Sequence, residues 1–430
     1  MKEALTTHNT GLRSSLVSYL ISSSWSKIVN QAGANATDVQ LVGLAAGAIS
    51  DDYSLCSTVV NSMLSTVAYK SGNNDGMMTD ASFTQHNIHG RQLYHNGYAN
   101  VYLFGFINIA NVVKGSSLQV PSSKDALIED FFLNGIQNLI YGPHYSDVLV
   151  SGRGFTGNPN SMPNSARWRW PLEAFIAYAP SRKAELEVLH DRMMGVTSET
   201  TVANKMFWHT DFMTHIRPTY YTSVRGTSNR TGGNESLKGA GKLSFHMGDG
   251  VNMVLHHGDE YATILPVWNW RRLPGTTIEQ RTDALPLVEG GTGGAGGTSY
   301  AGGVSDGRYG AYGFIFNENG SQNSNVDAYK AHFFFDDEFV ALGAGVSAPG
   351  AANSVVTTIN QTLHKSNFTV GGSSPQQAYS GGQAVLAEND WVHHYDIGYM
   401  MLGHYGTASA SVAVQHGRCS DIGDGLSTDL

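Results

Sequence analysis

Histidine, tyrosine and amide side chains are crowded into the stretch DASFTQHNIHGRQLYHNGYANVYL, residues 80–103. His86, His89 and His95 follow the spacing H-x2-H-x5-H, and Tyr98 comes three residues later. Such side chains can exchange protons when they lie within hydrogen-bond reach, because histidine titrates near neutral pH. The histidines could instead bind zinc, although their spacing fits none of the usual zinc motifs. The stretch is therefore a proton-transfer site, a metal site or a polar loop.

One reaction uses these residue types without a metal: elimination across C4 and C5 of a uronic acid. The carboxylate charge must be neutralised, a base must remove the C5 proton, and an acid must protonate the departing glycosidic oxygen. An amide and an arginine suit the first task, and histidine or tyrosine suits the other two. Besides Tyr98 and the histidines, the chain offers Asn35 in QAGANATD, Arg153 in VSGRGFTG and Glu235 in TGGNESLKG.

These segments resemble, in type and order, those of polysaccharide lyase family 8, which includes hyaluronate, chondroitin AC and xanthan lyases. GAN is similar to the family's catalytic asparagine segment, DGMMTDASFTQH to its histidine segment, LYHNGYANVYL to its tyrosine segment and SGRG to its arginine segment. RGTSNRTGGNESLKG, WNWRRLPGTT and FFFDDEFVALGAGV resemble blocks of the family's β domain. The matches run from about residue 31 to about residue 400, so together they are far more specific than GAN or SGRG alone.

The resemblance implies a role for each matched residue. Asn35 would bind and neutralise the uronate carboxylate, and a histidine would remove the C5 proton or assist that step. Tyr98 would donate the proton to the leaving oxygen, and in one version of the mechanism it is also the base. Arg153 would position the sugar and polarise the Tyr98 hydroxyl, and Glu235 would orient the arginine side of the site. No cofactor is required.

Two histidines compete for the catalytic position. Counting forward along DASFTQH places the family histidine at His86, whereas counting nine residues back from Tyr98 points to His89. The chain has about three additional residues between the two motifs, which explains the disagreement. The contiguous match favours His86, and His89 stays open as the alternative. His95 is expected to line the loop.

Further side chains are expected to contact the polymer. Position 157 holds glycine where the family often has a second arginine, so one cationic contact is missing or is supplied by Arg91, Arg167 or Arg169. The predicted substrate-binding residues are His89, Arg91, Asn96 and Trp168. Two of them have an ordinary alternative, a solvated loop arginine for Arg91 and packing beside a helix start for Trp168.

The spacing of hydrophobic residues along the chain changes near residue 200, from a helical period to a period of two. SSKDALIEDFFLNGIQNLIYGP, SRKAELEVLHDRMMG, ATDVQLVGLAAGAIS and VYLFGFINIANVVKG predict helices, the first two from helical spacing of apolar residues before a terminating glycine. Later segments alternate with a period of two. KLSFHMGDGVNMVLHH and HFFFDDEFVALGAGV each predict a hairpin, and SVVTTINQTL and DWVHHYDIGYMML predict further strands. The glycine-rich stretch 289–307 predicts a flexible surface loop.

The predicted fold is α+β and multidomain. A helical domain over residues 1–195 would precede an antiparallel β-sandwich domain over residues 200–430, and the resemblance implies that the helical domain is an incomplete α/α-toroid. The family has more helices before the GAN segment and a longer β domain at the end, so the resemblance implies a chain truncated at both ends.

Composition and net charge limit the classes of molecule that the protein is expected to bind. The 26 basic and 35 acidic residues of this 430-residue chain give a net charge of −9, which argues against general nucleic-acid binding. Cys56 and Cys419 are the two cysteines, so no cysteine metal motif exists. The N-terminal residues lack the apolar core of a signal peptide, and no apolar segment has the length of a membrane span. The expected partner is an anionic polysaccharide held in a locally basic cleft, and a monomer is expected, secreted if it follows the family.

Three functions follow from these observations. The favoured one is a carbon–oxygen lyase that cleaves a hyaluronate-like or chondroitin-like polysaccharide to unsaturated uronate ends, with alginate and xanthan as alternative substrates. A non-catalytic polysaccharide-binding relative is the second, because the arginine expected at position 157 is absent. A metalloenzyme that uses His86, His89 and His95 is the third.

Overall fold

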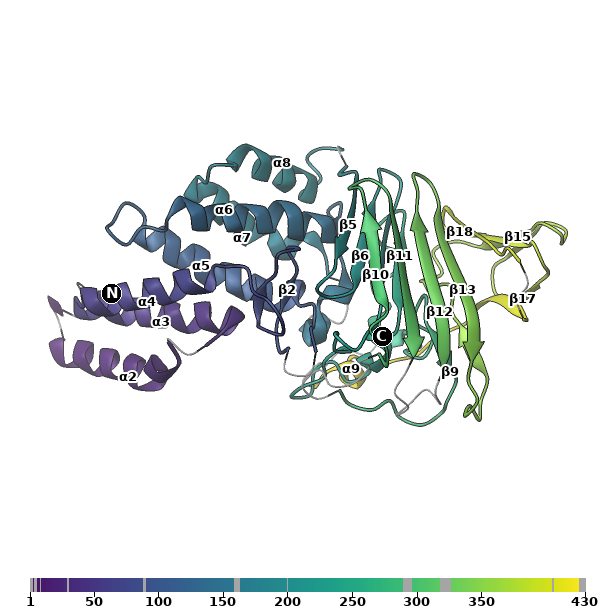
Figure 1. The fold of residues 1–430 in the computed structure, drawn as a ribbon, viewed down its shortest axis with the longest axis horizontal. Helices are drawn as coiled ribbons and strands as arrows, with labels where there is room; N and C mark the ends of the chain where they lie inside the picture. Colours follow the sequence, from purple (N-terminus) through teal and green to yellow (C-terminus); the bar gives the residue numbers. More distant parts are fainter. Residues whose placement is uncertain are drawn as a thin grey trace.

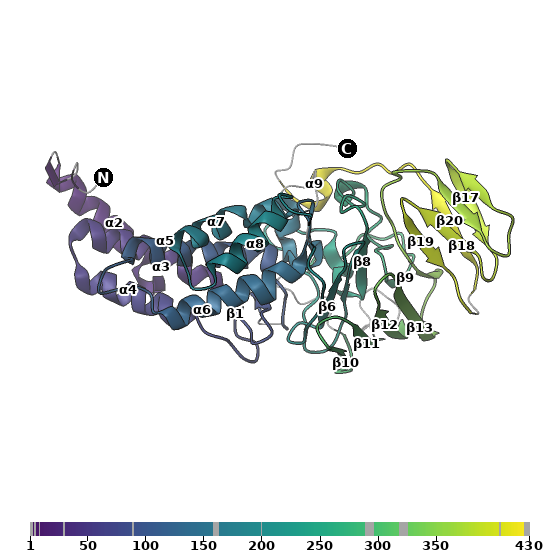
Figure 2. The same cartoon turned by 90° about the horizontal axis from the view of Figure 1, so that it is seen from above.

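The computed structural model describes residues 3, 6–7, 9–28, 31–87, 90–157, 163–198, 200–288, 296–317, 326–403 and 406–424. The molecule is elongated, with helices at one end and antiparallel sheets at the other (Figures 1 and 2). The predicted order of a helical domain followed by an antiparallel β domain is confirmed. No helix in the described part of the chain is long and apolar enough to cross a bilayer.

Among the described residues, seven helices of two or more turns build the first half. They are α2 (Thr10–Ile28), α3 (Gly33–Ser50), α4 (Tyr53–Thr66), α5 (Asn100–Val113), α6 (Ser122–Asp130), α7 (Arg169–Tyr178) and α8 (Lys183–Met193). The helix predicted after Ser122 continues beyond α6 as a π-helical turn (Phe131–Gly135) and a 3-10 turn (Ile136–Leu139). Its aromatic face joins the helical core, in which Phe131 and Phe132 are fully buried with Phe175 of α7.

Close backbone approach explains one glycine of α5. A Cβ atom on Gly105 would lie 2.6 Å from Cβ of Thr37 on α3 and 2.7 Å from the Thr37 carbonyl oxygen. No real Cβ tolerates such distances, so the contact between α3 and α5 requires glycine here. This contact matters for the site, because α3 carries Asn35 and α5 begins two residues after Tyr98.

The first large sheet lies between the helical half and a second sheet. It has the order β5 (Ala203–Phe207), β6 (Phe212–Ile216), β7 (Tyr221–Arg225), β8 (Val251–Leu255), and the second has the order β10 (Ala301–Ser305), β11 (Gly310–Asn317), β12 (Asp327–Phe334), β13 (Phe339–Ser347). Met213 and Val224 of the first sheet pack against Tyr312 and Phe314 of the second. The opposite face packs against residues 139–150 of the helical half. Every residue of β6 and β7 is consequently buried.

Smaller sheets complete the chain. β9 (Thr277–Glu279) pairs with β14 (Val355–Thr357), β17 (Gly382–Leu386) pairs with β20 (Ala408–Val412), and one sheet has the order β16 (Gln377–Tyr379), β15 (Phe368–Gly371), β18 (Trp391–His394), β19 (Ile397–Met400). The chain then returns towards the helical half, where α9 (Cys419–Ile422) lies near the junction of the two halves (Figure 2). There the amide of Lys242 donates to the Ile422 carbonyl at 3.1 Å.

One predicted hairpin and the predicted glycine-rich loop differ from the structure. The hairpin at Asp336-Asp337 is confirmed, because Phe334 of β12 pairs with Phe339 of β13. The hairpin predicted around residues 248–250 is wrong: Ser244–Gly248 is a 3-10 turn, and β8 pairs with β7 instead. The loop predicted over 289–307 is wrong at its end, where residues 301–305 form β10; residues 289–295 lie outside the described residues.

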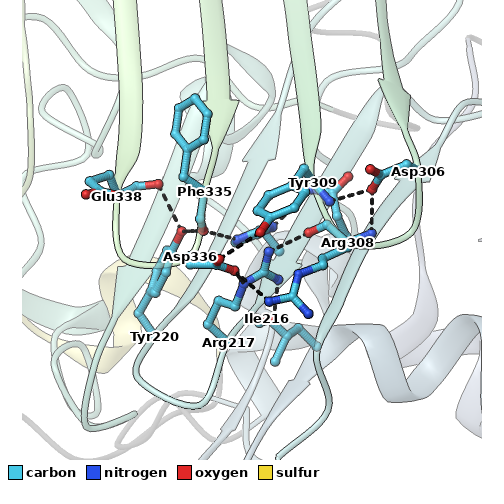
Figure 3. A network of polar contacts seen from close by, with 11 residues as sticks. Ile216, Arg217, Tyr220, Asp306, Arg308, Tyr309, Phe335, Asp336 and Glu338 are labelled. Atoms are coloured by element: carbon cyan, nitrogen blue, oxygen red, sulfur yellow. Dashed lines mark hydrogen bonds and ion pairs between the residues drawn. The ribbon is translucent and has the colours of Figure 1, made fainter.

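A buried arginine joins the turns at one end of the two sheets (Figure 3). The guanidinium of Arg217 donates to the Ile216 carbonyl at 3.0 Å, to the Arg308 carbonyl at 2.6 Å and to Asp336 Oδ1 at 2.8 Å. Beside it, the Tyr220 hydroxyl donates to the Phe335 carbonyl at 2.7 Å. The turn after β6 is thereby tied to both hairpin turns of the second sheet.

Replacing Arg217 by methionine tests this connection. The Arg217→Met variant retains most of the buried side-chain volume but loses all three guanidinium hydrogen bonds, so we expect the free energy of unfolding to fall by about 2 kcal/mol in urea titrations. Arg308→Met is the matched control, because the Arg308 side chain is exposed and its 3.2 Å pair with Asp336 is screened by solvent. Equal losses in the two variants would contradict the role assigned to Arg217.

Candidate active site

The segment that carries His86 is held by a partly buried loop network. The Gln85 side chain accepts the amide of Ala34 at 3.2 Å and donates to Asp75 Oδ2 at 2.8 Å, and the amide of Asn87 donates to Asp75 Oδ1 at 3.2 Å. Burial raises the pKa of Asp75, and the neighbouring backbone N–H groups oppose that rise. His86 itself has φ +60, a left-handed conformation that costs a non-glycine residue about 1 kcal/mol or more. The network therefore holds His86 in one strained orientation.

Two tyrosines stand next to His86, one just before a π-helical turn and one within it. Tyr94 directly precedes the turn (His95–Ala99), and Tyr98 lies within it, before α5 begins. The Tyr98 ring lies edge-on to the rings of His86 and Tyr94, at 4.8 Å between centroids in both cases. π-helical turns inside α-helices occur often at functional sites. The wider turn here places both tyrosines on the side of His86.

Arg153 connects the two tyrosines. It lies in a 3-10 turn (Gly152–Gly157), and its backbone amide donates to the Tyr94 hydroxyl at 3.0 Å while its Nη2 donates to the Tyr98 hydroxyl at 2.9 Å. Gly152 makes this approach possible: it has φ +53, and a Cβ there would lie 2.1 Å from Tyr94 Cζ. The cation at Tyr98 stabilises negative charge that develops on that hydroxyl.

Glu235 is the common partner of these residues, and it comes from the β half of the chain. Its Oε1 lies 2.7 Å from His86 Nδ1, and its Oε2 accepts the Tyr94 hydroxyl at 2.6 Å and forms an ion pair with Arg153. The carboxylate is 1 % exposed, against 25 % for His86 and 22 % for Arg153. One buried carboxylate thus joins three side chains of the helical half.

Electrostatics determine the protonation of this group. Burial would raise the pKa of Glu235, but hydrogen bonds from His86 and Tyr94 and the charge of Arg153 together lower it below its ordinary value. Burial and the nearby carboxylate raise the pKa of Tyr94 far above its usual value, so Tyr94 stays a neutral donor. An ionised Glu235 can only accept, so His86 must carry its proton on Nδ1. The lone pair is then on Nε2, which is the atom suited to act as a base.

Asn35 lies at the start of α3, beside the His86 segment in the hydrogen-bond network. The side chain is exposed in the first turn of the helix, and the adjacent amide of Ala34 is the one that Gln85 accepts. The helix N-terminus itself favours negative charge. An exposed amide at this position can therefore meet a carboxylate of a ligand that also contacts His86.

Two predicted substrate contacts are wrong because the side chains are enclosed. Trp168 is fully buried in the helical core, and its Nε1 donates to Ser146 Oγ at 3.3 Å, so its ring cannot stack on a sugar. Asn96 is also buried; its amide nitrogen donates to the Asp147 carbonyl and to Ser151 Oγ, and its oxygen accepts from Ser146 Oγ. Both side chains bind Ser146 in the protein interior instead of facing a ligand.

The remaining histidines and arginines lie elsewhere or are not described. His89 lies outside the described residues. His95 is fully buried and stacked on Phe131, burial lowers its pKa to about 3, and its Nε2 contacts the Ala81 carbonyl, so it neither lines the loop nor joins His86 at a metal. The Arg91 guanidinium donates to the Gly72 and His209 carbonyls, and no contact described for it involves Glu235.

The contacts described for the two other arginines, Arg167 and Arg169, also involve residues outside the Glu235 network. Arg167 donates to the Asn96 carbonyl at 2.9 Å, and burial lowers its pKa to about 10. Arg169 is exposed and pairs with Glu173 four residues later at 2.9 Å. The described contacts therefore show no replacement for the arginine that is absent at position 157.

Sequence reasoning missed Tyr94 and the loop network of Asp75 and Gln85. A signal for Tyr94 was present, because it precedes Tyr98 by four residues and such residues share one face of a helix. Asp75 offered no comparable signal, since its contacts with Gln85 and Asn87 depend on the fold of the loop. Four of the five predicted catalytic residues, namely His86, Tyr98, Arg153 and Glu235, lie in one contact network.

Two family models match the chain. The polysaccharide lyase family 8 N-terminal alpha-helical domain matches residues 18–184, and the family 8 super-sandwich domain matches residues 202–429. Among curated proteins, chondroitinase-AC of Pedobacter heparinus is 30 % identical over 332 residues, which cover 77 % of this chain and 46 % of that protein. The polysaccharide lyase 8 family protein HylA of Enterococcus faecalis is 24 % identical over 444 residues, which cover 92 % of this chain and 31 % of that protein. This chain thus spans half or less of these relatives.

Solved structures show the same architecture. A chondroitinase AC lyase studied in oligosaccharide complexes is 28 % identical, with a TM-score of 0.82. The match covers 92 % of this chain and 57 % of the lyase chain. A xanthan lyase from Paenibacillus, 21 % identical, shares the fold with a TM-score of 0.79 over 98 % of this chain and 43 % of its own. Since the super-sandwich model alone matches residues 202–429 and the helical model matches residues before it, the chain belongs to polysaccharide lyase family 8.

Proposed function

We propose that this chain carries the catalytic centre of a lyase that cleaves a uronic-acid-containing polysaccharide, of hyaluronate or chondroitin type, by β-elimination. The observation that carries the proposal is the Glu235 network. Glu235 accepts a hydrogen bond from the proton on Nδ1 of His86, which leaves the lone pair of the neutral ring on Nε2. Glu235 also pairs with Arg153, whose Nη2 lies 2.9 Å from the Tyr98 hydroxyl. The proposed base, His86, and the proposed acid, Tyr98, have ring centroids 4.8 Å apart, which supports this assignment. Relatives named chondroitinase and hyaluronate lyase support the substrate class.

The proposed reaction begins with neutralisation of the uronate carboxylate. The exposed Asn35 amide donates to it at the positive end of α3, so that negative charge developing on the carboxylate is stabilised when C5 loses its proton. His86 Nε2 takes the C5 proton. The electron pair left on C5 forms the C4–C5 double bond as the bond from C4 to the glycosidic oxygen breaks.

Tyr98 completes the step by protonating the departing oxygen. Its hydroxyl gives up a proton while Arg153 Nη2, 2.9 Å away, stabilises the phenolate that remains. His86 then releases its proton to water, and the Tyr98 phenolate takes a proton from water. Both groups thereby return to their starting states. These steps use side chains of the protein alone, and no cofactor is required.

Binding itself depends on local charge. The chain carries a net charge of −9, so an anionic polymer must be attracted by a local excess of positive potential around the site and not by the whole molecule. Salt should weaken such binding, because exposed charges are screened beyond about 10 Å at 0.1 M ionic strength. We further propose that the protein acts as a monomer outside the cell, where polymers of this class are found.

Tyr98→Phe is the most direct test. Only the hydroxyl is lost, so we expect the fold to persist and kcat to fall by about 10²- to 10⁴-fold. The assay follows absorbance of the unsaturated uronate with hyaluronate, chondroitin, alginate and xanthan. Tyr53→Phe is the control, since Tyr53 begins α4 and its hydroxyl contacts Ser117. Binding without product from a folded wild-type chain on all four polymers would instead support the non-catalytic relative.

The choice between the two histidines can be settled by paired variants. We expect His86→Ala to lower kcat by about 10²-fold or more, because it removes the base, with a smaller change in KM. His89→Ala should mainly raise KM if it contacts substrate. Steady-state kinetics on the preferred polymer distinguish the two. Loss of kcat in the His89 variant together with near-normal kcat in the His86 variant would reverse the assignment.

Glu235 links the site to acid stability. Its pKa in the folded protein is below the ordinary value of 4.5, so the unfolded chain binds more protons near that pH. This contribution to stability is complete above about pH 4.5 and is lost as pH falls through the lowered folded value. Urea unfolding between pH 3 and 7 should show a weaker acid dependence for Glu235→Gln, and about 2 kcal/mol lower stability at pH 7.

Glu187→Gln provides the control for this measurement. Glu187 lies on α8 with an exposed side chain, and its pair with Lys183 spans 3.6 Å, a geometry that contributes little. An acid profile of Glu235→Gln that coincides with those of the wild type and of Glu187→Gln would refute the assignment of an ionised, stabilising Glu235.

A further inference from the structure

A second cluster of ionisable side chains lies where β8 ends. His256 and His257 follow the last residue of β8, and Asp396 lies in the turn between β18 and β19. One possible ligand atom from each of the three side chains lies within 4.8 Å of the other two. His257 Nε2 is 2.9 Å from Asp396 Oδ2, and the two imidazole rings stand edge-on at 4.5 Å. Among the described residues, this is the one such group of three.

The backbone of both histidines is held rigidly by a buried carboxylate. Oε1 of Glu260 accepts the amides of His256 and His257, each at 2.7 Å, and Oε2 accepts the amide of Gly258 at 2.9 Å. Glu260 is almost fully buried, and Gly258 has φ +89, a conformation that suits glycine. The loop therefore presents the two imidazoles from a backbone whose donors are already satisfied.

Asp396 is presented with similar rigidity. His394 of β18 pairs with Ile397 of β19, so Tyr395 and Asp396 form a two-residue hairpin turn, with φ of +48 and +59. Two successive left-handed residues are the mark of a type I′ turn, which matches the twist of the flanking strands. The Tyr395 ring lies 4.3 Å from the His257 ring, and this contact holds the turn against the histidine loop.

The protonation of the cluster suits a metal. The Nδ1 atom of His256 faces the Thr219 carbonyl oxygen, which can only accept, so this nitrogen carries the proton and Nε2 has the free lone pair. Ligating histidines are characteristically fixed in this way, by donation of the other ring N–H to a carbonyl. Asp396 adds a carboxylate oxygen, Oδ2, which lies 2.9 Å from His257 Nε2.

We propose that His256, His257 and Asp396 bind a zinc ion, with water completing a tetrahedral shell. Two imidazoles and one carboxylate are a ligand set that zinc accepts, whereas calcium and magnesium prefer oxygen ligands alone. Tetrahedral zinc with bonds of about 2.0–2.1 Å places its ligand atoms about 3.3 Å apart. The atoms here lie within 4.8 Å, and the side chains of His257 and Asp396 are exposed enough to adjust.

The ion would join two parts of the β half. His256 and His257 extend the sheet that packs against the helical half, and Asp396 belongs to the small sheet of β15, β16, β18 and β19. The contacts that now hold the Asp396 turn to the histidine loop include the exposed pair of Asp396 with His257 at 2.9 Å and the Tyr395 hydroxyl donating to Asp259 at 3.0 Å. Such exposed contacts contribute little individually. A metal cross-link would hold the small sheet more firmly.

Metal titration of tag-free protein tests the proposal. The full chain is stripped with a chelator, titrated with zinc chloride by calorimetry and desalted before metal analysis. We expect one zinc ion per chain, affinity in the micromolar range or tighter, and a rise in the thermal midpoint. Cobalt chloride should produce the visible absorption bands of a tetrahedral site. His257→Ala and Asp396→Asn should each lose the retained ion and the thermal shift.

His416→Ala is the control, because His416 is exposed and lies outside this cluster. It should bind zinc as the wild type does. Wild-type protein that retains no zinc after desalting would overturn the proposal, as would retention that is equal in the wild type, His257→Ala and Asp396→Asn. Circular dichroism of each variant verifies the fold. The readouts do not depend on polysaccharide cleavage, so failure here is distinct from failure of the proposed lyase activity.

Discussion

The ion pair between Glu235 and Arg153 is the interaction on which the site depends. Glu235 comes from the β half, and it also accepts hydrogen bonds from His86 and Tyr94 of the helical half. A buried carboxylate is stable only when its charge is compensated and its lone pairs are occupied. Because three different segments provide that compensation, they can be assembled only when both halves of the chain are folded and in contact.

That contact is created by the burial of the first large sheet. One of its faces packs on the second sheet, and the other packs on residues 139–150, directly before the turn that carries Arg153. A sheet covered on both faces cannot move without losing apolar burial on both sides. The position of Arg153 relative to Glu235 is thus set by packing, and the strained φ of His86 is tolerated because Asp75 and Gln85 hold its neighbours.

Sequence alone could predict the elements whose patterns are local. α8 follows helical spacing from start to end, and the hairpin at Asp336-Asp337 follows its turn residues. The false hairpin at residues 248–250 arose because Ser244–Gly248 is buried throughout, so apolar alternation there did not report strand faces. The site residues were found through motif order, whereas the enclosure of Asn96 and Trp168 depends on Ser146, a residue distant in sequence that no local pattern connects with them.

Two residues between the histidine and tyrosine motifs, Gly90 and Arg91, form contacts that counting along the sequence could not reveal. Arg91 forms a parallel bridge with Thr231: its amide donates to the Arg230 carbonyl at 2.9 Å, and its carbonyl accepts the Gly232 amide at 3.0 Å. Gly90 has φ +128, and a Cβ there would lie 2.6 Å from the Gly232 nitrogen. Gly90 and Arg91 thus pack against residues 230–232, just before Glu235. The backbone of Arg91 therefore fastens the loop of Glu235 to the segment that leads from His86 to Tyr98, whose rings remain in contact.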